Sequence, residues 1–141
     1  MNTSKLLFAL LFLLLFSCHS DDNRPIQSPL PTGIEGSWKL TQVNGGITGT
    51  IYDYPEGMIT WKFNGISQTV VVQNNNNDES MQDILPSGTY PYSFVVNEAT
   101  PELCALNIEV NGMNLGCYNI GATQLTMSQI ESDGFFIKLI R

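Results

Sequence analysis

Apolar and polar residues alternate in short runs along most of the chain after its first third. An alternation with a period of two is typical of strands that bury one face, and no stretch here shows the longer period of an amphipathic helix. The runs are residues 36–43, 58–63, 67–73, 89–96, 106–110, 115–120, 124–130 and 135–141. The pattern therefore predicts an all-β domain of eight strands.

Short turn sequences connect several of these runs. Asn-Gly and Asp-Gly pairs favour tight hairpins, because both residues tolerate a positive φ. The turn signals are Asn64-Gly65, Asn111-Gly112, Gly121 and Asp133-Gly134. Strands joined in this way lie beside one another, and a meander of eight hides its edges best by closing on itself. We predict an eight-stranded antiparallel up-and-down barrel over residues 33–141.

The interior of such a barrel is just wide enough for side chains or for one small ligand. Four aromatic residues fall on the inward parity of their runs: Trp61, Tyr90, Tyr92 and Phe94. They are candidates for lining a ligand site, and the alternative is that they only fill the core. The two long connections, 45–57 and 74–88, fall at the same end of the meander, which predicts the mouth of the barrel there.

The start of the chain has the pattern of an export signal. Lys5 precedes an uninterrupted apolar run, residues 6–16, of about 11 residues. A bilayer-spanning helix needs about 20 apolar residues, whereas the apolar part of a signal peptide has about 7 to 15. We therefore expect residues 1–17 to be a cleaved signal peptide.

The residues that follow this run, Leu15-Phe16-Ser17-Cys18, resemble the lipobox of bacterial lipoproteins. In that family the peptide is cut before the cysteine, the cysteine thiol carries a diacylglycerol, and the new N-terminus is usually acylated as well. The resemblance implies lipidation at Cys18. Two or three acyl chains anchor a protein firmly, because a single chain binds a membrane only marginally.

An acidic stretch, His19-Ser20-Asp21-Asp22, comes directly after Cys18. It resembles the export signal of Gram-negative surface lipoproteins and implies an outer-membrane anchor with the protein exposed at the cell surface. An anchor that faces the periplasm is the alternative. Residues 18–32 contain three prolines and no apolar periodicity, which predicts a lipidated, disordered and extended tether.

The first predicted strand contains Gly36-Ser37-Trp38, which resembles the Gly-x-Trp signature of the lipocalin superfamily. In that family the Trp plugs one end of the barrel and an Arg near the last strand lies across it. Here the last run ends in Arg141, on the inward parity. The domain thus resembles the lipocalin-like domains of bacterial lipoproteins, which implies a barrel closed by Gly36, Trp38 and Arg141. The alternative is a core Trp38 and a frayed terminus at Arg141.

Cys104 and Cys117 remain once Cys18 carries lipid. They flank the Asn111-Gly112 turn and share the parity of inward residues in their runs. Cysteines on adjacent strands of an exported protein are expected to pair, and closing a loop of about 14 residues contributes about 3 kcal/mol. A metal or redox pair is the alternative, although neither a CxxC spacing nor a nearby histidine supports it.

Charge and composition exclude several functions. The net charge is −7 and becomes more negative when Lys5 is removed, so nucleic acid is not an expected partner. The only histidine, His19, lies in the tether, which leaves the domain without an imidazole for nucleophilic catalysis or metal binding. We expect no catalytic residues, no metal and no cofactor, and therefore not an enzyme.

Two functions remain after these exclusions. The first is a membrane-anchored barrel that binds a small apolar or aromatic molecule. The second is a barrel with a solid core whose loops, 52–55 and 74–86, contact an envelope or host protein.

Overall fold

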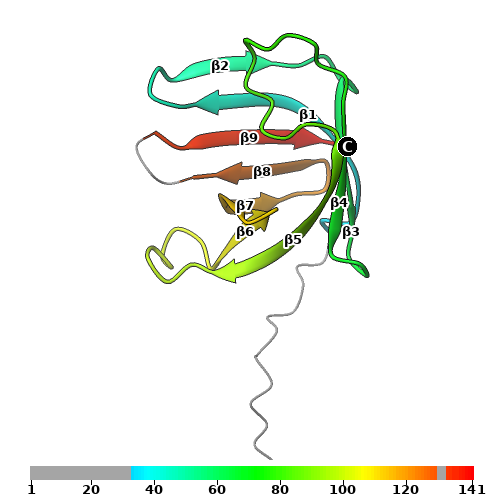
Figure 1. The fold of residues 1–141 in the computed structure, drawn as a ribbon. Coiled ribbons are helices and arrows are strands. Elements are labelled where there is room, and N and C mark those ends of the chain that lie inside the picture. The colour runs from blue at the N-terminus through cyan, green and yellow to red at the C-terminus, as the bar shows by residue number, and fades with distance from the viewer. Residues whose placement is uncertain (1–32, 130–132) are drawn as a thin grey trace, which may run out of the picture.

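The computed structural model describes residues 33–129 and 133–141, which form a single antiparallel sheet (Figure 1). Its strands are β1 (Gly36–Gly45), β2 (Thr50–Asp53), β3 (Ile59–Asn64), β4 (Thr69–Asn74), β5 (Gly88–Val96), β6 (Leu106–Val110), β7 (Met113–Ile120), β8 (Gln124–Ser128) and β9 (Phe135–Ile140). The predicted signal peptide, the tether, Cys18 and the acidic stretch lie outside the described residues. Within the described part, no helix is long and apolar enough to cross a membrane.

The sheet closes into the predicted eight-stranded barrel. Consecutive strands pair from β3 through to β9, and β1 closes the barrel by pairing with both β3 and β9. The remaining strand, β2, pairs only with Gln42–Gly45 of β1, beyond the part of β1 that pairs with β3. We had predicted a loop for this segment. Its residues are mostly exposed, so backbone pairing forms β2 without a buried face that an alternating pattern would reveal.

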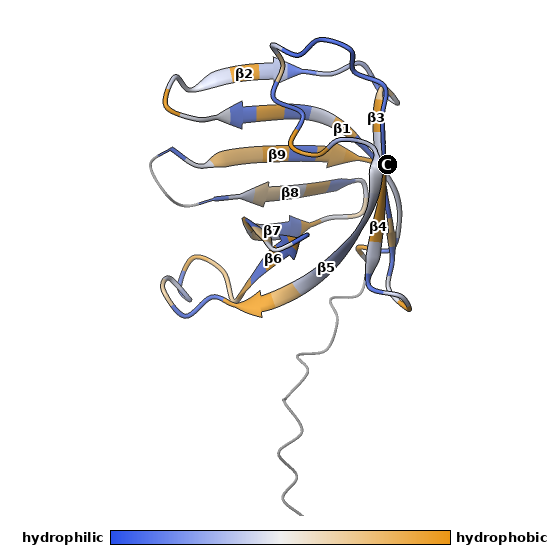
Figure 2. Ribbon diagram, in the orientation of Figure 1, coloured by the Kyte–Doolittle hydropathy of each residue, from blue (hydrophilic) through white to orange (hydrophobic). Residues whose placement is uncertain are grey.

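The hydrophobic core is the interior of the barrel. Most inward residues of the predicted alternation are buried, and Figure 2 shows apolar and polar residues alternating along β1. Trp38 and Trp61, both fully buried, lie opposite each other on β1 and β3. The other buried apolar residues are Ile34, Leu40, Val43, Tyr54, Ile59, Phe63, Val70, Val72, Leu85, Tyr92, Ile108, Val110, Leu115, Leu125, Met127, Ile137 and Leu139.

The turns differ in how well the sequence predicts them. Asn111 and Gly112 take φ of 53° and 75°, which is the predicted tight hairpin with two left-handed residues. Asn64 and Gly65 do not take a positive φ, so the tight hairpin predicted there is wrong. Instead the Asn64 side-chain oxygen accepts hydrogen bonds from the backbone N–H groups of Ile66 (3.0 Å) and Ser67 (3.1 Å), which stabilises a longer turn.

A bulge in β7 changes the side on which Cys117 lies. The register with β6 shifts along this strand, and Gly116 takes a φ of 83° with no room for a Cβ beside the Ser128 carbonyl. Leu115 therefore faces the interior, whereas Cys117 lies opposite Asn107 and Ser128 on the outer face. The predicted inward position of Cys117 is wrong, because the parity rule assumes an uninterrupted pleat.

The predicted disulfide between Cys104 and Cys117 is confirmed, with a Cα–Cα distance of 5.8 Å. It ties the connection between β5 and β6 to β7. Asn97, which is 4% exposed, packs against the bond: its amide nitrogen donates to the Thr100 carbonyl (3.0 Å) and lies 3.4 Å from Cys104 Sγ. The bridge spans 13 positions, for which loop closure accounts for about 3 kcal/mol of stability.

One end of the barrel is closed by the residues that the lipocalin resemblance implied. The Trp38 indole N–H donates to the Ile34 carbonyl (2.7 Å), and the Arg141 guanidinium lies 4.0 Å from the centroid of the Trp38 ring. Arg141 also donates to the Gly33 carbonyl. Gly36, with a φ of 107°, lets the chain turn from this cap into β1.

Replacing Arg141 tests this closure. We expect Arg141→Ala to lower the free energy of unfolding by about 1–2 kcal/mol, because it removes both the contact with the indole and the hydrogen bond to Gly33. For a domain of this size that is a fall in Tm of about 4–8 °C per kcal/mol. Arg141→Lys keeps the charge but not the flat guanidinium, so its Tm should lie between that of the unaltered protein and that of Arg141→Ala. An unchanged Tm in thermal denaturation of both variants would contradict the closure.

Candidate ligand-binding site

The end of the barrel opposite Trp38 carries its longest connection. Because the strands run alternately up and down, the connections β1–β2–β3, β4–β5, β6–β7 and β8–β9 meet at this end. The β4–β5 connection, residues 75–87, is the green segment that arches away from β4 in Figure 1. We call this segment the lid and this end of the barrel the mouth.

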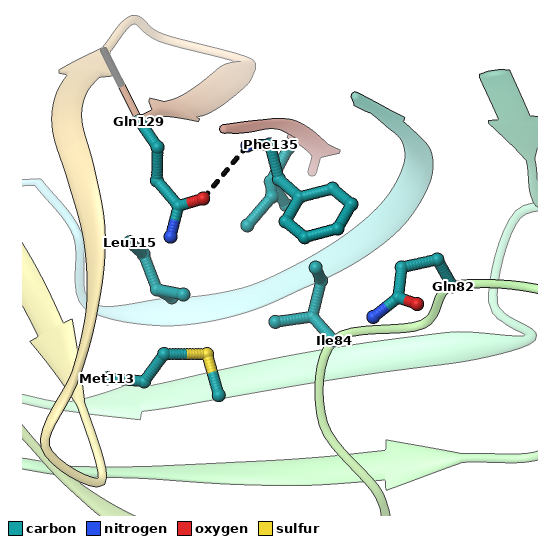
Figure 3. Close-up of a pocket in the computed structure, with 7 residues that line it drawn as sticks. Gln82, Ile84, Met113, Leu115, Gln129 and Phe135 are labelled. Carbon is teal, nitrogen blue, oxygen red and sulfur yellow. Dashed lines mark hydrogen bonds between the residues drawn. The ribbon is translucent and has the colours of Figure 1, made fainter. Parts of the chain in front are cut away.

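A pocket of 210 Å³ lies at the mouth, between the lid and the inner face of the barrel. Figure 3 shows its residues around a common space. They are Gln82 and Ile84 from the lid, Met113 and Leu115 from β7, Gln129 just after β8, and Phe135 and Ile137 from β9.

The pocket has an apolar base and polar groups nearer the solvent. Leu115 and Ile137 are 1% and 0% exposed and belong to the barrel core, so the base is set by the strands. Ile84 and Phe135 pack against that core from the lid and from β9. Apolar walls with a few placed polar groups are characteristic of small-molecule sites in proteins.

Gln129 braces one wall of the pocket. Its amide nitrogen donates to the Asn114 carbonyl (2.7 Å), and its amide oxygen accepts from the backbone N–H of Phe135 (2.9 Å; dashed in Figure 3). One side chain thus links β7 to β9 where β8 has ended. The side chain is held in one orientation by these two bonds, so this wall is preformed.

The lid places Ile84 over the pocket through a strained turn. Ile84 has a φ of 68°, which is rare for a β-branched residue, and the Leu85 N–H donates to the Asp83 carbonyl (2.8 Å) around it. This is a γ-turn of the uncommon positive-φ form. Such strain persists only where the surroundings enforce it, and it is concentrated at ligand-contacting and other functional sites.

Asn74, the last residue of β4, holds the backbone on both sides of Ile84 in this strained conformation. Its amide nitrogen donates both to the Asp83 carboxylate (2.6 Å) and to the Leu85 carbonyl (3.0 Å). The Leu85 side chain is buried at 4% exposure. Both neighbours of Ile84 are therefore fixed, and the Ile84 side chain has to lie against the mouth.

Tyr54 packs into the core below the lid. Its side chain is buried, and burial together with the nearby Asp83 carboxylate raises the pKa of Tyr54 to about 12. Tyr54 also shows that the segment 52–55, considered above as a protein-contacting loop, packs this aromatic residue inward. The exposed apolar side chains nearby are Ile47 and Ile51.

The four aromatic residues predicted to line a ligand site are not among the pocket residues. Trp61 and Tyr92 are buried in the core, where Tyr92 packs edge-on against Phe63 (5.2 Å) and Phe94 (5.9 Å between centroids). The Tyr90 hydroxyl donates to the Pro86 carbonyl (3.0 Å) at the end of the lid. Phe63 links Trp61 to Tyr92, and Tyr92 contacts Phe94, so three of the four belong to one series of aromatic contacts, whereas Tyr90 packs against the core beside it.

Two of these core residues keep unpaired polar atoms. Trp61 Nε1 and the Tyr92 hydroxyl are buried and have no hydrogen-bond partner among the described residues, as is also true of the Tyr54 hydroxyl. Buried donors of this kind cost about 1–3 kcal/mol each when nothing accepts from them. The interior of the barrel thus offers hydrogen-bond donors as well as apolar surface.

The residues that line the pocket had only weak signals in the sequence. Ile84 and Leu85 form an apolar pair which, with Met81, stands in a mostly polar connection, and Met113 and Phe135 are apolar residues at strand ends. A strand pattern predicts which residues face inward but not which loop folds over them. The sequence therefore predicted the mouth and missed its lining.

Within residues 33–129 and 133–141, no group of three or more His, Cys, Asp or Glu side chains is arranged to hold a metal ion. Comparisons with known proteins find no match to this chain, either among family models, among curated proteins or among solved structures. A function for the mouth has to be argued from its geometry.

Asn74→Ala tests the role of the lid clamp. We expect this variant to lose about 1–3 kcal/mol of stability, since the Leu85 carbonyl loses the bond from Asn74 and the Asp83 carboxylate keeps only the longer one from Asn76 (3.5 Å). Chemical denaturation followed by Trp fluorescence measures the loss. The neighbouring Asn75→Ala is the matched control, because its side chain makes none of these bonds. Equal stabilities of the two variants would show that the clamp contributes nothing.

Proposed function

We propose that this protein is a lipid-anchored, lipocalin-like barrel that binds a small apolar or aromatic molecule at its mouth. The observation that carries the proposal is the 210 Å³ pocket between the lid and the strands β7 and β9. An interior wide enough for one small ligand is a property of barrels with eight strands.

The pocket is organised before any ligand enters. Its base belongs to the barrel core, Gln129 braces one wall, and Asn74 holds the lid so that Ile84 forms another. A binding site that is already ordered avoids much of the entropy that ordering side chains and loops costs on binding. A loop held in this way by hydrogen bonds is expected at a binding site. A loop that only covers the end of the barrel would not need a fixed conformation.

The two ends of the barrel support the lipocalin-like assignment. Arg141 over Trp38 closes one end in the manner that the lipocalin resemblance implied, and the pocket lies at the other. The closed antiparallel barrel with up-and-down topology fits the same assignment. A ligand would then enter at the mouth.

The proposed anchor gives the barrel an orientation. Gly33, where the described part of the chain begins, lies at the closed end beside Arg141. A barrel attached through Cys18 and the tether would therefore turn its closed end to the membrane and its mouth to the medium. We propose that this membrane is the outer membrane and that the mouth is exposed at the cell surface.

Filling the pocket tests the binding function. Met113 is 43% exposed and lines the pocket, so Met113→Trp should occupy the space without disturbing the core. We expect ethylbenzene to bind the unaltered domain. Its affinity for this variant should be lower by a factor of about ten or more. The measurement is a titration followed by NMR shifts of the Leu115 and Ile137 methyl groups. Ile66→Trp, at a turn that is 98% exposed, is the control and should bind normally. Unshifted methyl groups in the unaltered domain would reject the function.

The anchor has a separate test. When the full chain is expressed in a Gram-negative host fed radiolabelled palmitate, we expect label in the protein and recovery in the outer-membrane fraction. Cys18→Ser should abolish both, because the acceptor thiol is gone, whereas Ser28→Ala, in the tether beyond the acidic stretch, should leave both intact. Added protease should digest the anchored protein on intact cells. An unlabelled but membrane-bound Cys18→Ser variant would contradict the lipid anchor.

A further inference from the structure

We propose that the pocket selects an uncharged molecule of about one aromatic ring that carries a single hydrogen-bonding group, a carbonyl or hydroxyl, which meets the amide of Gln82. The inference rests on the proposed binding function and adds the chemical class of the ligand. Three properties of the pocket carry it: the absence of charge in its lining, its volume, and the state of its two glutamines.

Among the described residues, no charged side chain lines the pocket. The Asp83 carboxylate, next to Gln82 and Ile84 in the lid, accepts a hydrogen bond from Asn74 (2.6 Å). An ionised group that enters loses its hydration, and this loss is costly unless an opposite charge or several hydrogen bonds replace the water. The described lining offers no opposite charge, so it discriminates against carboxylates and amines alike.

The volume limits the ligand to a small molecule. An engineered apolar cavity of about 150 Å³ in another protein binds benzene. The present pocket, at 210 Å³ and open at one side, has room for such a ring with a short substituent. A long acyl chain is too large for it to enclose.

The two glutamines differ in what they offer to a ligand. Both hydrogen-bonding ends of the Gln129 amide are occupied, by the Asn114 carbonyl and the Phe135 N–H. Gln82 is exposed on the lid, and Figure 3 shows its amide on the opposite side of the space from Gln129, directed toward the pocket. Gln129 is thus part of the wall, and Gln82 is the polar group that a bound molecule meets at the rim.

Three ring compounds of similar size separate these requirements: ethylbenzene, acetophenone and benzoate. With the unaltered domain at neutral pH, we expect acetophenone to bind about fivefold more tightly than ethylbenzene, since one hydrogen bond is gained. Benzoate should bind at least about tenfold more weakly than acetophenone, because its charge is desolvated without a partner. The same methyl shifts used above report each titration.

Gln82→Leu provides the decisive variant. It should reduce the affinity for acetophenone to that for ethylbenzene and leave ethylbenzene binding unchanged. Gln124→Leu, an exposed glutamine at the start of β8, is the matched control and should keep the preference.

The outcomes distinguish the role of Gln82 from the binding function itself. Ethylbenzene binding without a preference for acetophenone, or with a preference that survives Gln82→Leu, overturns the role of Gln82 and leaves the proposed function standing. Tight benzoate binding overturns the selection against charge. If none of the three compounds binds, the proposed function fails and the inference fails with it.

Discussion

The hydrogen bonds that join β1 to both β3 and β9 are the constraint on which the structure depends. Through them the sheet has no free edge around the barrel, so that every inward side chain is enclosed. β1 pairs with β3 along one edge and with β9 along the other, and the register with β9 shifts between Leu40 and Gln42. At Gly45 the two backbones come so close that a Cβ would collide with the Gly134 carbonyl. Because the ring of strands is closed, the interior has a defined open end, which is the mouth.

Burial and backbone geometry divide what the sequence can predict from what it cannot. The strands of the barrel were predictable, because their inward residues are apolar and their outward residues polar, as at Trp61 and Lys62. The contact between Trp38 and Arg141 followed from a family resemblance, and the disulfide followed from two cysteines that flank a predicted turn in a chain with a predicted export signal. Each of these depends on side chains that the pattern displays.

The features that the sequence did not predict depend on backbone conformation or on contacts between distant segments. β2 pairs with β1 without an alternating buried face, and the bulge at Gly116 reverses the parity for the rest of β7. The pocket requires the positive φ of Ile84, which Asn74 imposes from ten positions away. The sequence does not predict this turn, since an isoleucine disfavours a positive φ. The candidate site was therefore predictable as an end of the barrel and not as a set of residues.

The placement of the disulfide on the outer face also bears on the order in which the molecule is assembled. Cys117 lies beside Asn107 and Ser128, outside the packed interior, and both cysteines retain some exposure. An oxidant can reach thiols in this position after the strands have closed, which an inward pair would not allow. The barrel can thus form first and direct the pairing of its own cysteines, and the cross-link then locks a topology that already exists.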